Sequence, residues 1–163
     1  MIDFMVNLLN FLSDELIIFM ISMVPLIELR GSIPFGIGFY GIDPLTTFLL
    51  TYPASLIPGP FIILFINAIF KLLEKIKFFA KIIDKVIYRT RRKHTEKIEK
   101  FGYIGLFIIV AIPLPGTGVW SGSLAAALFN MKFAKSMLMI ILGNLVAGLI
   151  ILLLSIGVFS FVS

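Results

Sequence analysis

The sequence predicts an all-α integral membrane protein, an inverted-topology repeat of a re-entrant hairpin plus a transmembrane helix, joined by an amphipathic cytoplasmic helix. Two observations carry this prediction. Apolar residues make up 60% of the 163 residues and charged residues only 14%, whereas soluble domains are about 25% charged. A domain of this size cannot bury so much apolar surface, so lipid must cover the excess. The second observation is that short and long apolar segments follow the same order in both halves.

The first hairpin is expected between Leu16 and Tyr40. Leu16–Val24 is apolar but only nine residues long, about 13 Å of helix, and a full span needs about 20 residues. It stops at Pro25, and a second short segment follows at Ser32–Tyr40. The preceding residues are acidic and lack a basic region, so we expect mature structure there and no secretory signal.

The first full span is expected over Leu45–Phe70. This segment is apolar throughout but contains Pro53, Pro58, Gly59 and Pro60. Such residues are tolerated in a membrane span where neighbouring protein satisfies the freed carbonyl groups. We therefore expect this span to pack against other helices.

A basic connector follows at Lys71–Lys100. It holds 11 of the 14 Lys and Arg residues and four acids, while the rest of the chain has three bases and five acids. By the positive-inside rule this block is cytoplasmic, and an ordinary solvated helix face would lie there too. Nucleic-acid binding is not expected between two membrane segments. Apolar residues recur every three or four positions, which predicts an amphipathic helix on the membrane surface: Leu72, Ile76, Phe79, Ile83 and Ile87.

The second half repeats the pattern. Gly102–Ile112 is again too short to span, Pro113–Gly116 interrupts it, and Val119–Phe129 forms the second arm of a hairpin. Ala134–Val162 is the second full span. An alternative interpretation is four or five ordinary spanning helices with proline kinks.

The two halves align without gaps when they are offset by 88 residues, with breaks rather than identical residues in register. We expect one membrane domain over residues 1–163: a first repeat at 1–70, the connector at 71–100 and a second repeat at 101–163. Acids flank the first hairpin and bases flank the second. The hairpins should therefore enter from opposite sides, an inverted repeat of the kind that builds transporters with a midplane site.

Glu28 and Arg30 are the only charges predicted at membrane depth. A charge there costs about 3 kcal/mol on insertion scales, so we expect a functional pair; the alternative is an ion pair that only fixes the hairpin. Gly31-Ser32-Ile33-Pro34 reads as a helix start, with Ser32 as N-cap and Pro34 in the first turn. Thr117 is expected to cap the returning arm of the second hairpin in the same way.

Two helix N-termini and an arginine favour a phosphate or carboxylate ligand. Burial opposes ionisation of Glu28 while Arg30 favours it, so Glu28 is a candidate for proton exchange. The single tryptophan, Trp120, either lines the site or packs. The predicted substrate-binding residues come from both hairpins: Glu28, Arg30, Gly31, Ser32, Pro34, Pro113, Pro115, Gly116, Thr117, Gly118 and Trp120.

Enzymatic chemistry is not expected. The chain has no cysteine and lacks a phosphate-binding Gly-Lys-Ser loop, a His-Glu-x-x-His pair and the paired-aspartate signature of alcohol phosphotransferases. The only histidine, His94, lies in the basic connector, where we expect it to be solvated. No catalytic residue, metal site or cofactor is predicted. Asn67 and Asn144 are expected to form hydrogen bonds between helices.

Three segments together resemble one protein family: Glu28–Pro34, Pro113–Trp120 and Leu142–Gly148. The chain resembles the putative small multidrug export proteins, distant relatives of the DedA/VTT superfamily. The superfamily resemblance implies two facing re-entrant hairpins and translocation of lipids, with polyprenyl phosphates or phospholipids as substrates. It also implies that Glu28 and Arg30 match the acid and base of the first hairpin. DedA proteins carry arginine in the second hairpin, and Pro113–Trp120 has none.

We therefore expect a multi-pass transporter or flippase of the cell membrane that moves an anionic, phosphate-bearing lipid through a midplane site. One alternative is a proton-coupled exporter of small amphipathic molecules, in which Glu28 is the exchanging group. Another is a non-transporting membrane scaffold whose basic connector recruits partners. A homo-oligomer is left open, and the membrane lipid is the expected partner.

Overall fold

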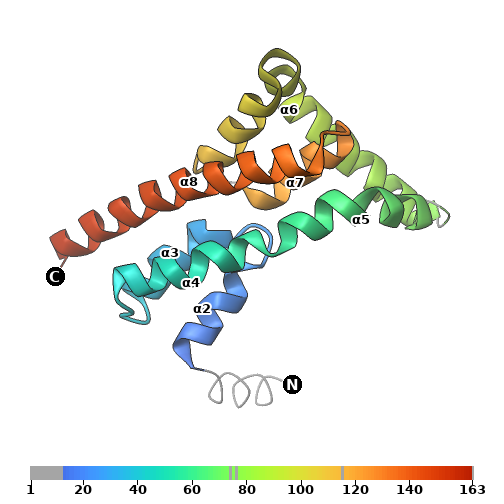
Figure 1. Ribbon diagram of the computed structural model, residues 1–163. Helices are drawn as coiled ribbons and strands as arrows, with labels where there is room; N and C mark the ends of the chain where they lie inside the picture. The colour runs from blue at the N-terminus through green and yellow to red at the C-terminus, as the bar shows by residue number, and fades with distance from the viewer. Residues whose placement is uncertain (1–12, 74, 76, 115, 163) are drawn as a thin grey trace. The chain divides into compact units, whose positions relative to one another are not determined.

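The computed structural model describes residues 13–162 except 74, 76 and 115 (Figure 1). Within these residues the chain is helical and contains no strand, which confirms the predicted all-α class. The helices are α2 (Asp14–Ser22), α3 (Glu28–Gly38), α4 (Pro44–Leu56), α5 (Pro58–Leu73), α6 (Lys77–Ala111), α7 (Val119–Leu128) and α8 (Phe133–Val162). Gly102, with φ of 54°, interrupts α6, so the apolar end of α6 is a separate short helix at Lys100–Ala111.

Local sequence explains where the first helices begin. The Ser13 side chain accepts a hydrogen bond from the Leu16 amide at the start of α2, and two acids follow in the first turn, where the helix dipole favours them. Asp43 caps α4: its Oδ2 accepts a hydrogen bond from the Thr46 amide at 3.0 Å. Pro44 occupies the first position of that helix, where no amide hydrogen is needed.

The chain divides into two compact units. The first comprises residues up to Ser55 together with Ala147–Ser163, and the second comprises Leu56–Val146. The division therefore cuts both long apolar helical segments, one near Pro53 and Pro58 and the other inside α8. Each unit contains one pair of short helices and half of each long segment.

In the first unit α2 packs against α3, and Ile18, Leu29 and Ile33 are fully buried. Two glycines allow close approach. A Cβ at Gly36 of α3 would lie 2.7 Å from the Thr47 side chain of α4, and one at Gly148 of α8 would lie 2.8 Å from the Phe48 ring. The short hairpin is thus held by α4 and by the final half of α8.

In the second unit α7 packs against both α5 and α6. The core consists of buried side chains from α6, α7 and α8: Leu106, Val110, Val119, Ala126 and Ile140. Gly143 brings α8 against the backbone of α6, because an added Cβ would lie 2.8 Å from the Phe107 carbonyl oxygen. Gly59 plays a comparable part for α5, where a Cβ would lie 3.2 Å from Val119.

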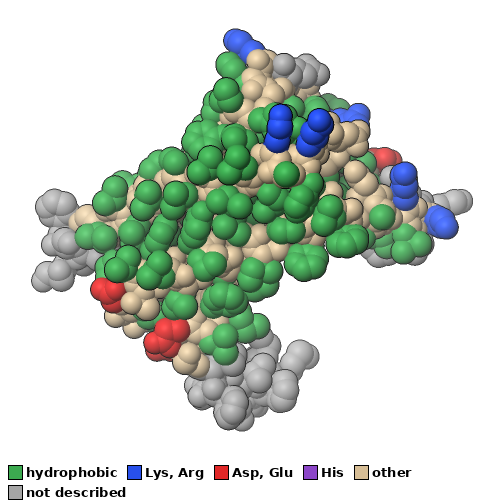
Figure 2. Space-filling model, in the orientation of Figure 1, with side chains coloured by type: hydrophobic (Ala, Val, Ile, Leu, Met, Phe, Trp, Pro, Cys, Tyr) green, Lys and Arg blue, Asp and Glu red, His purple; other side chains and the backbone are tan. Residues whose placement is uncertain are grey.

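In the part of the chain that the structure describes, two helical segments are long and apolar enough to cross a membrane, Pro44–Leu73 and Phe133–Val158. These match the two full spans expected from the sequence. Only 17% and 33% of their most apolar windows are buried, whereas a core helix of a soluble protein would be mostly buried. Leucine and phenylalanine side chains stand exposed along them, and Figure 2 shows hydrophobic side chains over much of the visible surface. The two segments therefore present surfaces suited to lipid.

The basic connector differs from the prediction in two ways. It is not one surface helix, because α5 continues through Leu73 and α6 begins at Lys77. Part of its apolar face is also buried within the fold and does not face the membrane surface, since Ile83 and Ile98 are buried. The expectation that His94 is solvated is wrong: its exposed fraction is 3%, because it lies on the same face of α6 as these two residues.

Candidate functional site

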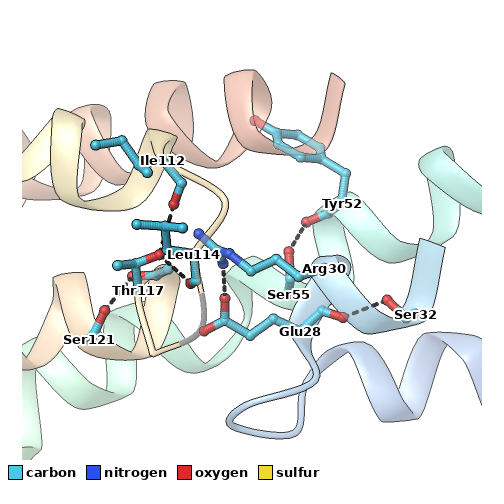
Figure 3. A network of polar contacts seen from close by, with 10 residues as sticks. Glu28, Arg30, Ser32, Tyr52, Ser55, Ile112, Leu114, Thr117 and Ser121 are labelled. Carbon is cyan, nitrogen blue, oxygen red and sulfur yellow. Dashed lines mark hydrogen bonds and ion pairs between the residues drawn. The ribbon is translucent and has the colours of Figure 1, made fainter. Parts of the chain in front are cut away.

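The start of α3 holds a buried ion pair. The Arg30 Nη1 atom lies 2.6 Å from Glu28 Oε2, and the exposed side-chain fractions are 11% for Arg30 and 4% for Glu28 (Figure 3). Residues two apart do not face each other on a regular helix. They meet here because Glu28, the first residue of α3, has φ of 45° and so departs from regular helical geometry. Such a conformation costs an L-residue about 1–2 kcal/mol, so the surrounding fold holds the pair in place.

Ser32 does not cap α3, so that prediction is wrong. The helix begins four residues earlier, at Glu28. Its N-cap residue is Ile27, which provides no side-chain cap. The Ser32 hydroxyl instead donates to the Glu28 carbonyl oxygen over 2.6 Å and accepts from the Ser22 hydroxyl over 2.7 Å. Ser32 therefore ties the backbone beneath the ion pair to α2.

Gly31 and Pro34 shape the same turn, and the predicted position of Pro34 is wrong. Pro34 lies inside α3 and not in its first turn. It has no amide hydrogen for the Arg30 carbonyl, four residues earlier, to accept. A Cβ at Gly31 would lie 2.9 Å from the Ile27 side chain, so a larger residue would disturb the break between α2 and α3.

The second break joins α6 to α7. Gly116 and Gly118 have φ of 73° and 124°, conformations that favour glycine. Thr117 does not cap α7, contrary to the prediction, because the N-cap residue is Gly118 and has no side-chain cap. The Thr117 hydroxyl lies 2.7 Å from the Ile112 carbonyl oxygen and 2.6 Å from that of Leu114, to which it donates (Figure 3). It therefore closes the loop itself. Pro113 is half-buried in this loop, and Pro115 lies outside the described residues.

Trp120 stands in the first turn of α7, half-buried. It lines an apolar pocket of about 370 Å³ together with residues of α5 and α6. The pair Glu28 and Arg30 belongs to the first compact unit, and Trp120 belongs to the second. The predicted site residues are therefore two groups, one at each helix break.

The buried hydroxyl groups of α4 were not predicted from the sequence. Thr47, Thr51 and Ser55 have no exposed surface, and each hydroxyl donates to a carbonyl oxygen three or four residues earlier. Their spacing of four residues puts them on one helix face and was the available signal. Asn67 behaves as predicted, since its side-chain amide donates to the Ala127 carbonyl oxygen of α7 at 3.2 Å.

A family model described as "Putative small multi-drug export protein" matches residues 28–150, a stretch that begins at Glu28, directly after the first helix break, and includes the second break. The chain belongs to this family. No curated protein and no solved structure gives a significant match. Family membership and the two apolar helical segments together identify a membrane protein, and the family description points to membrane transport.

Proposed function

We propose that this family member is a multi-pass transporter of the cell membrane that moves an anionic, phosphate-bearing lipid, with Arg30 as the phosphate-binding residue. The observation that carries the proposal is the buried pair of Glu28 and Arg30 in a membrane protein. A charge pair at membrane depth is expensive, and an apolar pair would stabilise the hairpin at lower cost. A function that requires the charges accounts for their presence.

The pair suggests how a phosphate would be exchanged. Glu28 occupies Nη1 of Arg30, so a phosphate that binds the Nη1–Nη2 edge of the guanidinium in two-pronged fashion must displace the carboxylate. Protonation of Glu28 weakens its hold on Arg30 and removes its repulsion of the anion. Substrate binding is then coupled to proton uptake at Glu28, and substrate release is coupled to its loss.

The proposed transporter is an inverted repeat of two re-entrant hairpins. The helix bounds support this: α2 and the short apolar helix at the end of α6 begin at Asp14 and Lys100, 86 residues apart, and α4 and α8 begin 89 residues apart. The helices of 9 to 12 residues around each break are about 14–18 Å long. Each is too short to cross a hydrocarbon core of about 30 Å. The relation to DedA/VTT proteins rests on the motif resemblance alone.

Membrane topology tests the repeat. With single cysteines introduced into the cysteine-free chain, an impermeant thiol reagent should label positions 13 and 43 from outside and positions 93 and 132 from inside. This pattern follows if the hairpins enter from opposite sides. Labelling of positions 43 and 132 from the same side refutes the inverted arrangement.

Charge substitutions test the site. In vesicles with a fluorescent phosphate-bearing lipid, Arg30→Gln should abolish translocation, while Arg30→Lys should recover only part because lysine lacks the two-pronged geometry. Glu28→Gln should remove the pH dependence. Arg92→Gln, on the exposed surface of α6, is the control for loss of one positive charge.

The double variant Glu28→Gln with Arg30→Gln separates function from structure. If the two residues only neutralise each other, each single change leaves a buried charge and destabilises the fold by about 3–5 kcal/mol. The double change should then restore both stability and activity. An active double variant would falsify the proposed site.

Export of small amphipathic molecules is the second candidate, because the family description names drug export. In that case a proton-exchanging Glu28 is required, whereas Arg30 contributes no attraction for a cationic substrate. Retained efflux in Arg30→Gln, together with loss in Glu28→Gln, would favour this function over lipid translocation.

A further inference from the structure

The second compact unit contains an apolar pocket at the meeting point of α5, α6 and α7. Its volume is about 370 Å³, within the range of small-molecule sites. Ile62, Ile66 and Phe70 line it from α5, and Trp120 lines it from α7. Among the described lining residues, the indole N–H of Trp120 and the hydroxyl of Ser121 are the only side-chain polar groups. Such a lining suits an alkyl chain.

A second pocket of about 330 Å³ adjoins this one, because Phe70 lines both. It is formed by the same three helices, but by residues further along α6 and α7. Half of its lining residues are polar or basic, among them Asn67 and Lys71 from α5 and Arg91 from α6. No carboxylate occurs among the described residues that line it.

The order of the two pockets along the helices matches the order of parts in a lipid. Trp120 lies at the start of α7, next to the helix break, whereas the basic pocket reaches Asn130 beyond the end of α7. Lys71 and Arg91 are exposed to solvent, and they belong to the basic connector, which the positive-inside rule places at the anionic cytoplasmic surface. An apolar chain would extend inward from a charged group held at that surface.

We propose that this unit binds one anionic phospholipid, with an acyl chain in the apolar pocket at Trp120 and its phosphate at Lys71 and Arg91. The site differs from the Glu28–Arg30 pair, and binding there does not depend on transport. Two cations and no described carboxylate favour an anionic lipid over a zwitterionic one, because a zwitterionic head group brings its own positive charge to the same pocket.

Trp120 provides the assay, because it is the only tryptophan. Bromine atoms on an acyl chain quench tryptophan fluorescence when they are in contact with it. The full-length protein is reconstituted in phosphatidylcholine vesicles with a small fraction of either brominated phosphatidylglycerol or brominated phosphatidylcholine. At equal fractions the phosphatidylglycerol should quench Trp120 more strongly. Equal quenching by the two lipids overturns the proposal.

The double variant Lys71→Gln with Arg91→Gln should reduce the preference for phosphatidylglycerol roughly tenfold or more, because two charge-assisted contacts are lost. Lys81→Gln with Arg89→Gln is the matched control: it removes two exposed bases of α6 that line neither pocket. An equal loss in the control overturns the proposal, since attraction to the basic surface alone would then explain the preference.

Ile66→Phe tests the position of the acyl chain by narrowing the apolar pocket, and it should lower quenching by phosphatidylglycerol. Unchanged quenching would place the chain elsewhere and overturn the proposal. Helix content and elution volume check the fold of each variant, and the single variants Lys71→Gln and Arg91→Gln replace the pair if it fails to fold. Arg30→Gln should leave quenching unchanged. Quenching therefore tests lipid binding at Trp120, whereas translocation tests the proposed transport, and either proposal can fail without the other.

Discussion

Gly143 gives the sharpest test of how the second hairpin is held. A Cβ at this position would lie 2.8 Å from the Phe107 carbonyl oxygen, 2.9 Å from the Val110 Cβ and 3.2 Å from the Ala111 amide nitrogen. Two of these three atoms belong to the backbone of α6 and cannot rotate away. In Gly143→Ala, the apolar end of α6 and α8 must therefore separate.

Two opposing effects determine how far Gly143→Ala changes the free energy of unfolding. Overpacking of a core costs about 1–3 kcal/mol, and the rigid backbone neighbours place this site in the upper half of that range. Replacing glycine by alanine in a helix contributes about 1 kcal/mol in the other direction. We expect Gly143→Ala to lower the free energy of unfolding by about 1–2 kcal/mol.

Gly157 supplies the control in the same helix, because a Cβ there meets nothing within 4 Å. Gly157→Ala should keep the propensity gain of about 0.5–1 kcal/mol without the clash. Thermal unfolding followed by circular dichroism in detergent should separate the two variants by roughly 4–8 °C. Equal midpoints would show that α6 and α8 do not approach closely at Gly143.

Two further predictions concern side-chain hydrogen bonds, one at the start of α4 and one in the loop between α6 and α7. Asp43→Ala should cost about 1 kcal/mol, because the Thr46 amide loses its cap, whereas Asp43→Asn should keep most of the stability in the same unfolding measurement. Thr117→Val should also cost about 1 kcal/mol by removing the hydrogen bonds to the Ile112 and Leu114 carbonyl oxygens. Thr117→Ser retains the hydroxyl and should behave like the native protein; a loss in Thr117→Ser as large as in Thr117→Val would show that the hydroxyl is not what matters.

The bounds of the apolar helices could be predicted from the sequence because length and hydropathy determine them. The expected spans at Leu45–Phe70 and Ala134–Val162 differ by only a few residues from Pro44–Leu73 and Phe133–Val158. The expected arm at Val119–Phe129 likewise corresponds to α7. In each case a proline, glycine or charged residue interrupts an apolar run, and these residues act locally.

The roles of Ser32 and Thr117 could not be predicted from local rules. Ser32 would cap a helix that began after Arg30, but α3 begins at Glu28 because Leu26 and Glu28 adopt positive φ values of 80° and 45°. Nothing in a leucine or a glutamate signals such a conformation, which packing must impose. The N-cap residue of α7 is the next residue, Gly118, with φ of 124°. The Thr117 hydroxyl therefore bonds to carbonyl oxygens of the loop and not to the start of the helix.

The pairing of Glu28 with Arg30 was foreseeable because no other charge was expected at membrane depth, but its geometry was not, since it depends on the same positive φ. The burial of His94 was missed for a related reason. A histidine in a run of bases reads as solvated, and only the packing of α6 in the second unit shows that it shares a buried face with Ile83 and Ile98.

Each compact unit contains half of both long apolar segments because the helices of the two hairpins are short. Two helices of about ten residues bury little surface between them, and each pair therefore needs longer partners. The first pair obtains them from α4 and from the end of α8, through Gly36 and Gly148. The second obtains them from α5 and the start of α8, through Gly59 and Gly143. Because both spans contribute to both units, neither sequence half contains all the partners of its own hairpin. Three of these glycines, Gly59, Gly143 and Gly148, lie near the middle of the spans, where each span passes from one unit to the other.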